Sequence, residues 1–288
     1  MDHHHDDDHH QGLSCDLETL TRKARERRQV LRWFTSTGML ALAGCGASTE
    51  TSGGGGGGGG SGGSGGSGGA ESGGGGSGGA GSCSEIPEET AGPYPGDGSN
   101  GVNALTLSGI VRSDIRSSVD GASGTAEGVQ LTVTLTILDK SDCSPIAGRA
   151  VYLWHCNQAG EYSMYSAAIA DENYLRGVQE TDENGQVTFT TIFPGCYDGR
   201  WPHMHFEVYP SLDEATDSAN KLATSQLAMP EAACNEVYAT SGYETSVENL
   251  ANTSLASDNV FADDGAELQL AAVSEAAEGY LATLTVSV

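Results

Sequence analysis

The chain has 288 residues, of which 42 are glycine, and it carries 39 acidic against 13 basic side chains. Half of the glycines, 21, lie between positions 53 and 81, and from Cys83 onward 30 acidic and 7 basic side chains leave a net charge of −23. This uneven composition excludes a uniform globular chain, and the acidic surface excludes a nucleic-acid-binding protein because it repels phosphate backbones.

The first 44 residues have the pattern of an export signal. A basic stretch contains the twin arginines Arg27 and Arg28, and a 12-residue apolar run follows from Trp33 to Gly44. A membrane-spanning helix takes about 20 residues, so this run suits the core of a signal peptide better. The arginines resemble a Tat signal, and Leu-Ala-Gly-Cys resembles a bacterial lipobox, which implies acylation of Cys45 after cleavage. We therefore expect an exported protein, lipid-anchored to the cell envelope on its periplasmic or outer side; the alternative is a cytoplasmic extension.

The segment from Gly46 to Ser82 is nearly all glycine, serine, alanine and threonine. It has no large apolar side chain that could nucleate a core, so it is predicted to be a flexible tether with an end-to-end distance of roughly 33 Å. The predicted organisation is a signal over residues 1–44, a lipidated cysteine with its tether over 45–82, and one folded domain over 83–288.

The folded domain is predicted to consist mainly of β-strands. Between Val129 and Ile137 apolar and polar side chains alternate, which is typical of a half-buried strand. Short helices are predicted only over Leu212–Ala223 and Ala271–Glu278. Many short strands with frequent turns and no alternation with helices favour an all-β sandwich, mostly antiparallel, with long active-site loops. The predicted strands are Leu105–Arg112, Val129–Ile137, Arg149–Cys156, Gln186–Ile192, His203–Tyr209 and Tyr280–Val288.

Five cysteines follow Cys45 in the sequence, and an exported domain favours disulfides among them. The odd number leaves at least one thiol free. The sequence assigns no pairs; the best guess joins Cys196 with Cys234, because both lie in loop-like segments. The five are Cys83, Cys143, Cys156, Cys196 and Cys234.

Histidines and tyrosines gather in two segments of the domain. His203 and His205 are two residues apart on a predicted strand, so both imidazoles point to the same face and could clamp a metal; the alternative is ordinary surface or core histidines. Tyr162 follows an earlier strand, and Tyr197 precedes the histidine pair. Two phenolates with two imidazoles suit ferric iron, whose binding would deprotonate phenols that normally titrate near pH 10.

At these residues the chain resembles the intradiol ring-cleavage dioxygenases, the family of protocatechuate 3,4-dioxygenase and catechol 1,2-dioxygenase. The similarity extends roughly over residues 85–265 and is most like that of exported members. The segments that carry it are Thr90–Tyr94, Cys143–Ser163, Leu175–Gly185 and Thr191–Phe206.

The resemblance implies a β-sandwich enzyme with a non-haem Fe(III). Tyr197 would be the axial tyrosinate, which is released when a catechol chelates the iron and then acts as a base. Arg200 would stabilise negative charge on the substrate, while Gln226 and Tyr94 would lie at the substrate pocket. The implied iron ligands are Tyr162, Tyr197, His203 and His205.

Other polar residues near these motifs have simpler interpretations. His155 is interpreted as a hydrogen-bonded structural histidine, and Arg176 as structural, with an acidic neighbour as a candidate partner. For Trp201 the sequence leaves two interpretations equally open: a residue in the pocket wall, or a residue that anchors the loop. Cys196, beside a proposed ligand, is interpreted as half of a disulfide rather than as an iron ligand.

The leading functional hypothesis is cleavage of a catechol-type diol between its two hydroxylated carbons with O₂. The alternative is a surface lipoprotein that binds metal or ligand at the same residues without turnover, and a third option is an adhesion-type structural sandwich. Because the acidic domain would repel anions, a neutral catechol or a larger aromatic diol is favoured over protocatechuate. The choice between a monomer and a homo-oligomer stays open.

Overall fold

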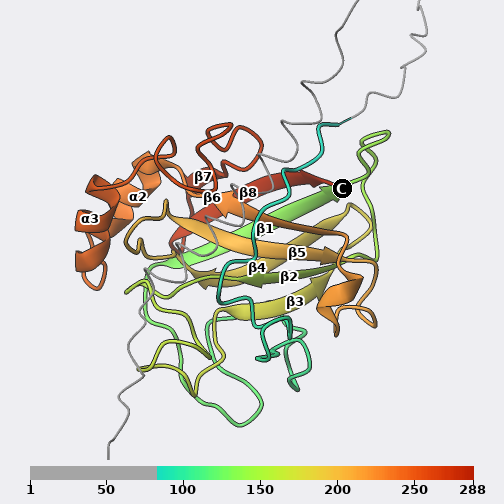
Figure 1. Cartoon of the computed structure of the whole chain (residues 1–288), viewed down its shortest axis with the longest axis horizontal. Coiled ribbons are helices and arrows are strands. Elements are labelled where there is room, and N and C mark those ends of the chain that lie inside the picture. Colours follow the sequence, from blue (N-terminus) through green and yellow to red (C-terminus); the bar gives the residue numbers. More distant parts are fainter. Residues whose placement is uncertain (1–82) are drawn as a thin grey trace, which may run out of the picture. The chain divides into compact units, whose positions relative to one another are not determined.

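The computed structural model describes residues 83–288, and the predicted signal, Cys45 and the tether lie outside this range. The described chain forms two four-stranded sheets (Figure 1). The first sheet has the order β4-β1-β8-β7 and the second β3-β2-β5-β6. The predicted all-β sandwich is therefore confirmed. The strands are β1 (Gln130–Leu138), β2 (Ala150–Trp154), β3 (Arg176–Glu180), β4 (Gln186–Ile192), β5 (His203–Tyr209), β6 (Ala223–Ala228), β7 (Ala272–Glu275) and β8 (Tyr280–Ser287).

Neighbouring strands run antiparallel in both sheets except for β1 and β8, which are parallel. The alternating sequence of β1 gives alternating burial, with its aliphatic side chains inside and its threonines on the outer face. Met204, Phe206 and Val208 of β5 face the same core from the second sheet. Burial of these two apolar faces against each other is the main force that holds the layers together.

Strand β5 is buried along its whole length, including the side that faces away from the other sheet. Loops cover this outer side, where Tyr152, Trp154 and Tyr209 form a second apolar cluster with residues of the segment 104–110. Side chains on the outer face of the second sheet therefore stand in an enclosed space, although they lie outside the central core.

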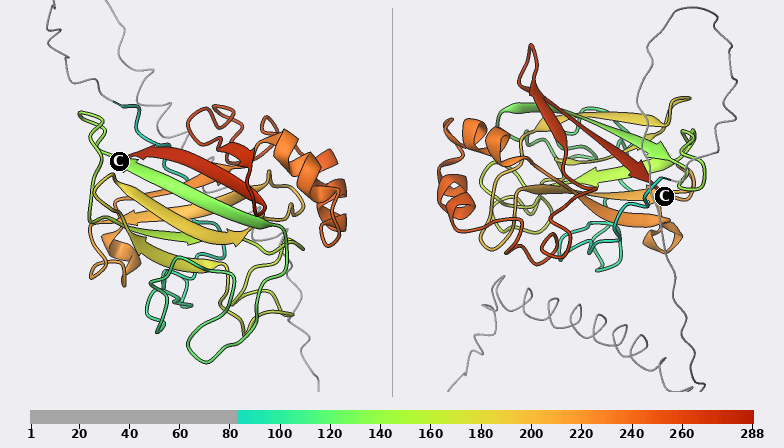
Figure 2. Two further views of the ribbon diagram at one scale, coloured as in Figure 1. Left: turned by 180° about the vertical axis from the view of Figure 1, so that it is seen from behind. Right: turned by 90° about the horizontal axis from the view of Figure 1, so that it is seen from above.

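Two short helices were not predicted: α2 (Glu231–Tyr238) and α3 (Glu244–Ala251), which stand together at one end of the sandwich (Figures 1 and 2). The C-terminus lies at the opposite end. No helix within residues 83–288 is long and apolar enough to cross a membrane.

Three predicted elements differ from the structure. Residues 105–112 form turns rather than a strand, since Leu105 and Ile110 insert separately into the second apolar cluster. The predicted helix 212–223 consists of turns and a short 3₁₀ helix (Ser218–Asn220). The predicted helix 271–278 is instead the edge strand β7, because pairing with β8 outweighs the helix propensity of its alanines and glutamate.

The disulfide joins Cys83 to Cys143, so the guess that paired Cys196 with Cys234 is wrong. The Cys196 sulfur instead contacts the carbonyl of Arg200 at 3.5 Å, and the Cys234 thiol is hydrogen-bonded to Tyr238 within α2. Both thiols are free and buried, as is Cys156.

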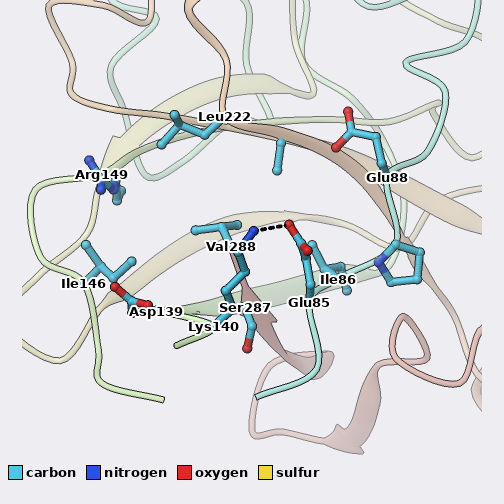
Figure 3. Close-up of a pocket in the computed structure, with 12 residues that line it drawn as sticks. Glu85, Ile86, Glu88, Asp139, Lys140, Ile146, Arg149, Leu222, Ser287 and Val288 are labelled. Atoms are coloured by element: carbon cyan, nitrogen blue, oxygen red, sulfur yellow. Dashed lines mark hydrogen bonds and ion pairs between the residues drawn. The ribbon is translucent and has the colours of Figure 1, made fainter. Parts of the chain in front are cut away.

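The segment that follows Cys83 runs along the open edge of β6. The amide of Ile86 donates to the carbonyl of Ser287, and that of Glu89 donates to the carbonyl of Thr224. A cavity of about 600 Å³ lies where this segment starts, between the C-terminus and the loop after β1 (Figure 3). An ion pair between Lys140 and Glu85 crosses it. None of the predicted site residues lines this cavity.

Candidate metal centre

The sheet register places one row of polar and aromatic side chains on the outer face of the second sheet. Trp154 of β2 pairs with His205 of β5, which pairs in turn with Gln226 of β6. Residues that pair across antiparallel strands share a face, and His203 joins them because it lies two residues from His205. The His205 ring stacks on Trp154 with centroids 4.9 Å apart and planes 6° apart. The predicted same-face histidine pair is thus present.

Two loops bring the tyrosines over this face. Tyr162 follows β2, Tyr197 lies between β4 and β5, and their hydroxyl oxygens are 3.5 Å apart. Gly160 lets the loops approach: its φ is +82°, and a Cβ there would lie only 3.0 Å from Cβ of Tyr197. A larger residue at position 160 would therefore strain its own backbone and push the tyrosines apart.

Four donor atoms converge at this point. The Tyr197 hydroxyl lies 3.1 Å from Nε2 of His203, which is itself 3.1 Å from Nε2 of His205. Two ligands that are about 2.1 Å from one metal and at right angles to each other are about 3.0 Å apart, so these spacings fit neighbouring ligands of one ion. The donors are the Tyr162 and Tyr197 hydroxyl oxygens and Nε2 of His203 and His205.

The protonation states of the histidines favour metal binding. His203 Nδ1 donates a hydrogen bond to the carbonyl of Trp201 at 2.5 Å. Nε2 therefore carries the lone pair, which is directed at the other three candidate metal-ligand atoms. The His205 ring is buried and is hydrogen-bonded to the backbone of Thr90. Burial lowers the pKa of both imidazoles well below the usual value, so neither carries a charge near neutral pH.

Burial acts in the opposite direction on the tyrosines. It raises the pKa of Tyr197 to about 12 and that of Tyr162 well above its usual value, so both are neutral phenols without a metal. A metal that binds here must displace two phenol protons and receives two hard anionic ligands in return. Residues 83–288 contain no group of three or more His, Cys, Asp and Glu side chains suited to a metal, because half of this donor set is phenolic.

Arg200 lies against the donor cluster, as predicted. Its Nη1 is 3.3 Å from Nε2 of His203, and its Nη2 donates to Oε1 of Gln226 at 2.6 Å. Gln226 in turn donates through Nε2 to the carbonyl of Thr90 at 2.8 Å. The predicted substrate-binding pair, Arg200 and Gln226, is therefore brought together beside the histidines.

The segment around Tyr94 forms one wall of the site. The Tyr94 ring lies 5.1 Å from the ring of Tyr162 and 5.1 Å from that of Tyr165. Two residues earlier, a Cβ on Gly92 would lie 3.4 Å from Cε1 of His205. Tyr94 thus packs against a proposed ligand, and its role at the substrate pocket stays a prediction.

The neighbouring residues prove to be structural. His155 is buried, with Nδ1 donating to the carbonyl of Cys156 and Nε2 bonded to the Thr191 hydroxyl, and burial lowers its pKa to about 4. The indole of Trp201 donates to the carbonyl of Met229, which makes this side chain a loop anchor.

Arg176 differs in detail from its prediction. Within residues 83–288 no carboxylate pairs with it; its guanidinium instead donates to three backbone carbonyls. It thereby fastens the Tyr94 segment to the loop that carries Tyr162. The carbonyls belong to Tyr94, Pro95 and Ser163.

Sequence reasoning missed Asp258, which lies in the loop after α3 and is fully buried. Its Oδ2 accepts from Nε of Arg200 at 2.9 Å and from the amide of Trp201 at 2.7 Å. No periodicity or short motif connects it with Arg200, 58 residues earlier.

Comparison with known proteins gives consistent results. The family model described as "Dioxygenase" matches residues 112–212, a range that contains both tyrosines, Arg200 and the histidine pair. Over 71 residues the chain is 34% identical to chlorocatechol 1,2-dioxygenase of Rhodococcus opacus and 35% identical to hydroxyquinol 1,2-dioxygenase of a Rhizobium species. These alignments cover 25% of this chain, and only 27% and 24% of the relatives.

A solved structure extends the similarity. The intradiol ring-cleavage dioxygenase from Tetranychus urticae superposes with a TM-score of 0.55 at 26% identity. The superposition covers 71% of this chain and 94% of that protein. The similarity therefore includes nearly the whole of the solved protein.

Proposed function

Because this chain belongs to the family of intradiol ring-cleavage dioxygenases, we propose that it cleaves a catechol-type diol between its two hydroxylated carbons, using O₂ and a non-haem Fe(III). The observation that carries the proposal is the convergence of two phenol oxygens and two imidazole nitrogens at 3.1–3.5 Å spacings on one sheet face. Tyr162, Tyr197, His203 and His205 would hold the iron.

Bound ferric iron would draw electron density from a coordinated catecholate and so prepare the ring for reaction with O₂. Tyr197 is the proposed base that takes a proton from a substrate hydroxyl. Among the two tyrosines it is the more exposed, and exposed Asp198 and Gly199 follow it, whereas Tyr162 is only 2% exposed. Of the two tyrosines, Tyr197 is therefore the one that can leave the donor cluster at the lower cost in packing.

Arg200 is proposed to stabilise negative charge that develops on the substrate. Arg200 is 4% exposed and its guanidinium is held by hydrogen bonds, so it needs no reorganisation during the reaction. Tyr94 and Gln226 would bound the ring of the diol. The net charge of −23 for the domain supports a neutral diol as the substrate.

The proposal is tested by loading the metal-free full chain with ferrous iron and exposing it to air. Phenolate bound to Fe(III) should give a red-brown visible absorption. Added catechol should yield a muconate-type product, identified by chromatography and mass spectrometry. A protein that stays colourless would refute the iron centre, and an extradiol semialdehyde would refute the cleavage position.

Colour without turnover of any catechol, chlorocatechol or hydroxyquinol would favour the alternative, a metal- or ligand-binding surface protein. Arg200 and Gln226 argue for turnover, because a site that only holds metal has no use for a charged group placed beside its ligands. The substrate panel therefore separates the two functions.

We also propose that the protein is exported and anchored to the cell envelope through a lipid on Cys45. The buried Tyr/His cluster supports export in the folded state, since iron could then be inserted before transport. Replacing Cys45 with serine should move the protein from the membrane fraction to the soluble fraction after cell fractionation. A variant that stays in the membrane fraction to the same extent as the parent would contradict the lipid anchor.

A further inference from the structure

Asp258 joins two loops at the edge of the proposed iron site. One carboxylate oxygen binds Arg200 and the amide of Trp201, and the other accepts from the amides of Val260 and Phe261 at 2.8 and 3.1 Å. All four partners of this fully buried side chain are N–H groups, which can only donate. A protonated carboxyl oxygen would point its own hydrogen at one of these donors, so the carboxylate must be ionised. The pair with Arg200 is thus a buried ion pair.

This ion pair fixes the orientation of Arg200. Asp258 holds Nε from one side, Gln226 holds Nη2 from another, and the ring of Phe261 lies 5.9 Å from the guanidinium carbon. Nη1 is the nitrogen left to face the donor cluster, at 3.3 Å from His203. Small rotations of the guanidinium are blocked on three sides.

The ion pair also cancels the charge that Arg200 would bring to the site. Arg200 is the cation that contacts the donor cluster, and Asp258 cancels its charge. Arg176, another buried cation nearby, has its nitrogens turned to the carbonyls of the Tyr94 segment and of Ser163. At the distance of a ring substituent the two charges largely cancel, so a substrate's own carboxylate would meet no unpaired cation there and would have to approach a buried aspartate. Nη1 still points at the donor cluster and can donate a short-range hydrogen bond to negative charge that develops beside it.

We propose that Asp258 is a positioning and specificity-determining residue: it fixes Arg200 and neutralises it, so that the site selects uncharged diols over carboxylate-bearing ones. The inference rests on the proposed ring-cleavage function and names the substrate class of that site. It predicts that the parent enzyme binds catechol more tightly than 3,4-dihydroxybenzoate, and that removing the Asp258 charge shifts this preference toward the acid by about tenfold, the size expected for one unit charge about 10 Å away at an effective dielectric constant of about 20.

The experiment compares the full-length parent with Asp258→Asn, Asp258→Glu and Glu267→Gln. Asp258→Asn removes the charge, Asp258→Glu keeps it but displaces it, and Glu267→Gln removes a charge from an exposed position in the same region of the chain. Dissociation constants for catechol and 3,4-dihydroxybenzoate are measured by calorimetry on the metal-free proteins. They are also measured by visible absorption on the iron-loaded proteins without O₂, and kcat/KM is then measured in air.

Asp258→Asn should shift the ratio of the two dissociation constants toward 3,4-dihydroxybenzoate by about tenfold, with a lower kcat for both substrates. Asp258→Glu should lower kcat but leave the ratio within about twofold of the parent, and Glu267→Gln should change neither. An unchanged ratio in Asp258→Asn would show that the residue only supports the fold. If Asp258→Asn does not fold, the test rests on the parent enzyme. Equal affinity of the parent for the two diols, or tighter binding of 3,4-dihydroxybenzoate, overturns the inference.

The outcomes separate this inference from the proposed function. A colourless, inactive parent refutes the iron enzyme, whereas the calorimetric ratio on metal-free protein still reports the charge at Arg200. An active parent whose ratio does not respond to Asp258→Asn refutes the inference alone.

Discussion

Replacing Tyr197 with phenylalanine is expected to lower kcat for catechol cleavage by about 10²–10⁴-fold, the usual contribution of a positioned general base. The phenol oxygen lies 3.1 Å from Nε2 of His203, so its removal takes away a proposed ligand and the proposed base together. The visible absorption should weaken but persist, because Tyr162 still supplies one phenolate. Stopped-flow kinetics and a visible spectrum of the iron-loaded variant measure both effects.

Tyr280→Phe is the matched control for this variant. It also removes one phenol hydroxyl, but from the start of β8, where the hydroxyl donates to Glu236 on the surface. Its kcat and colour should equal those of the parent. Catechol cleavage at the parent rate in Tyr197→Phe would show that another group acts as the base.

Replacing both Cys83 and Cys143 with serine is expected to lower the free energy of unfolding by about 4 kcal/mol, the chain-entropy value for a cross-link that closes a loop of about 60 residues. The expected loss is large for a domain whose total stability is typically about 5–15 kcal/mol. Denaturant unfolding of parent and variant measures it. Colour and ring cleavage at low temperature should be unchanged, because neither cysteine contacts the donor cluster.

A reducing agent provides the control for the disulfide. It should destabilise the parent to the level of the double serine variant and leave that variant unaffected. The three other cysteines of the domain are buried free thiols and should not contribute. A loss below about 1 kcal/mol would mean that the unfolded chain gains little freedom when the bond is absent.

Local periodicity in the sequence was enough to predict the elements that form the centre of the fold. The alternation in β1 and the His-x-His spacing in β5 depend only on residues close together in the chain, and both describe the structure correctly. The sequence patterns do not predict the edge strands β3 and β6, and they assign β7 to a helix, because the pairing partners of these strands, not their own composition, decide their conformation.

The candidate site divides in the same way. The resemblance assigns the residues that lie in short sequence motifs, and the structure brings their side chains together. These residues are Tyr162, Tyr197 and the two histidines. Asp258 could not be found, since its partner Arg200 lies 58 residues away and only the packing of two loops joins them. The disulfide was missed for the same reason: its cysteines are 60 residues apart and lie in irregular segments.

The course of the chain after Cys83 has a mechanical consequence. This segment follows β6 from the end that holds the C-terminus to the proposed iron site, where Gly92 lies against the ring of His205. Without the disulfide, a pulling force applied to the chain ahead of Cys83 would separate the segment from β6 one hydrogen bond at a time and move Gly92 away from His205. The covalent bond to Cys143 takes up that load at the first described residue, so the wall of the site is shielded from tension in the chain that precedes it.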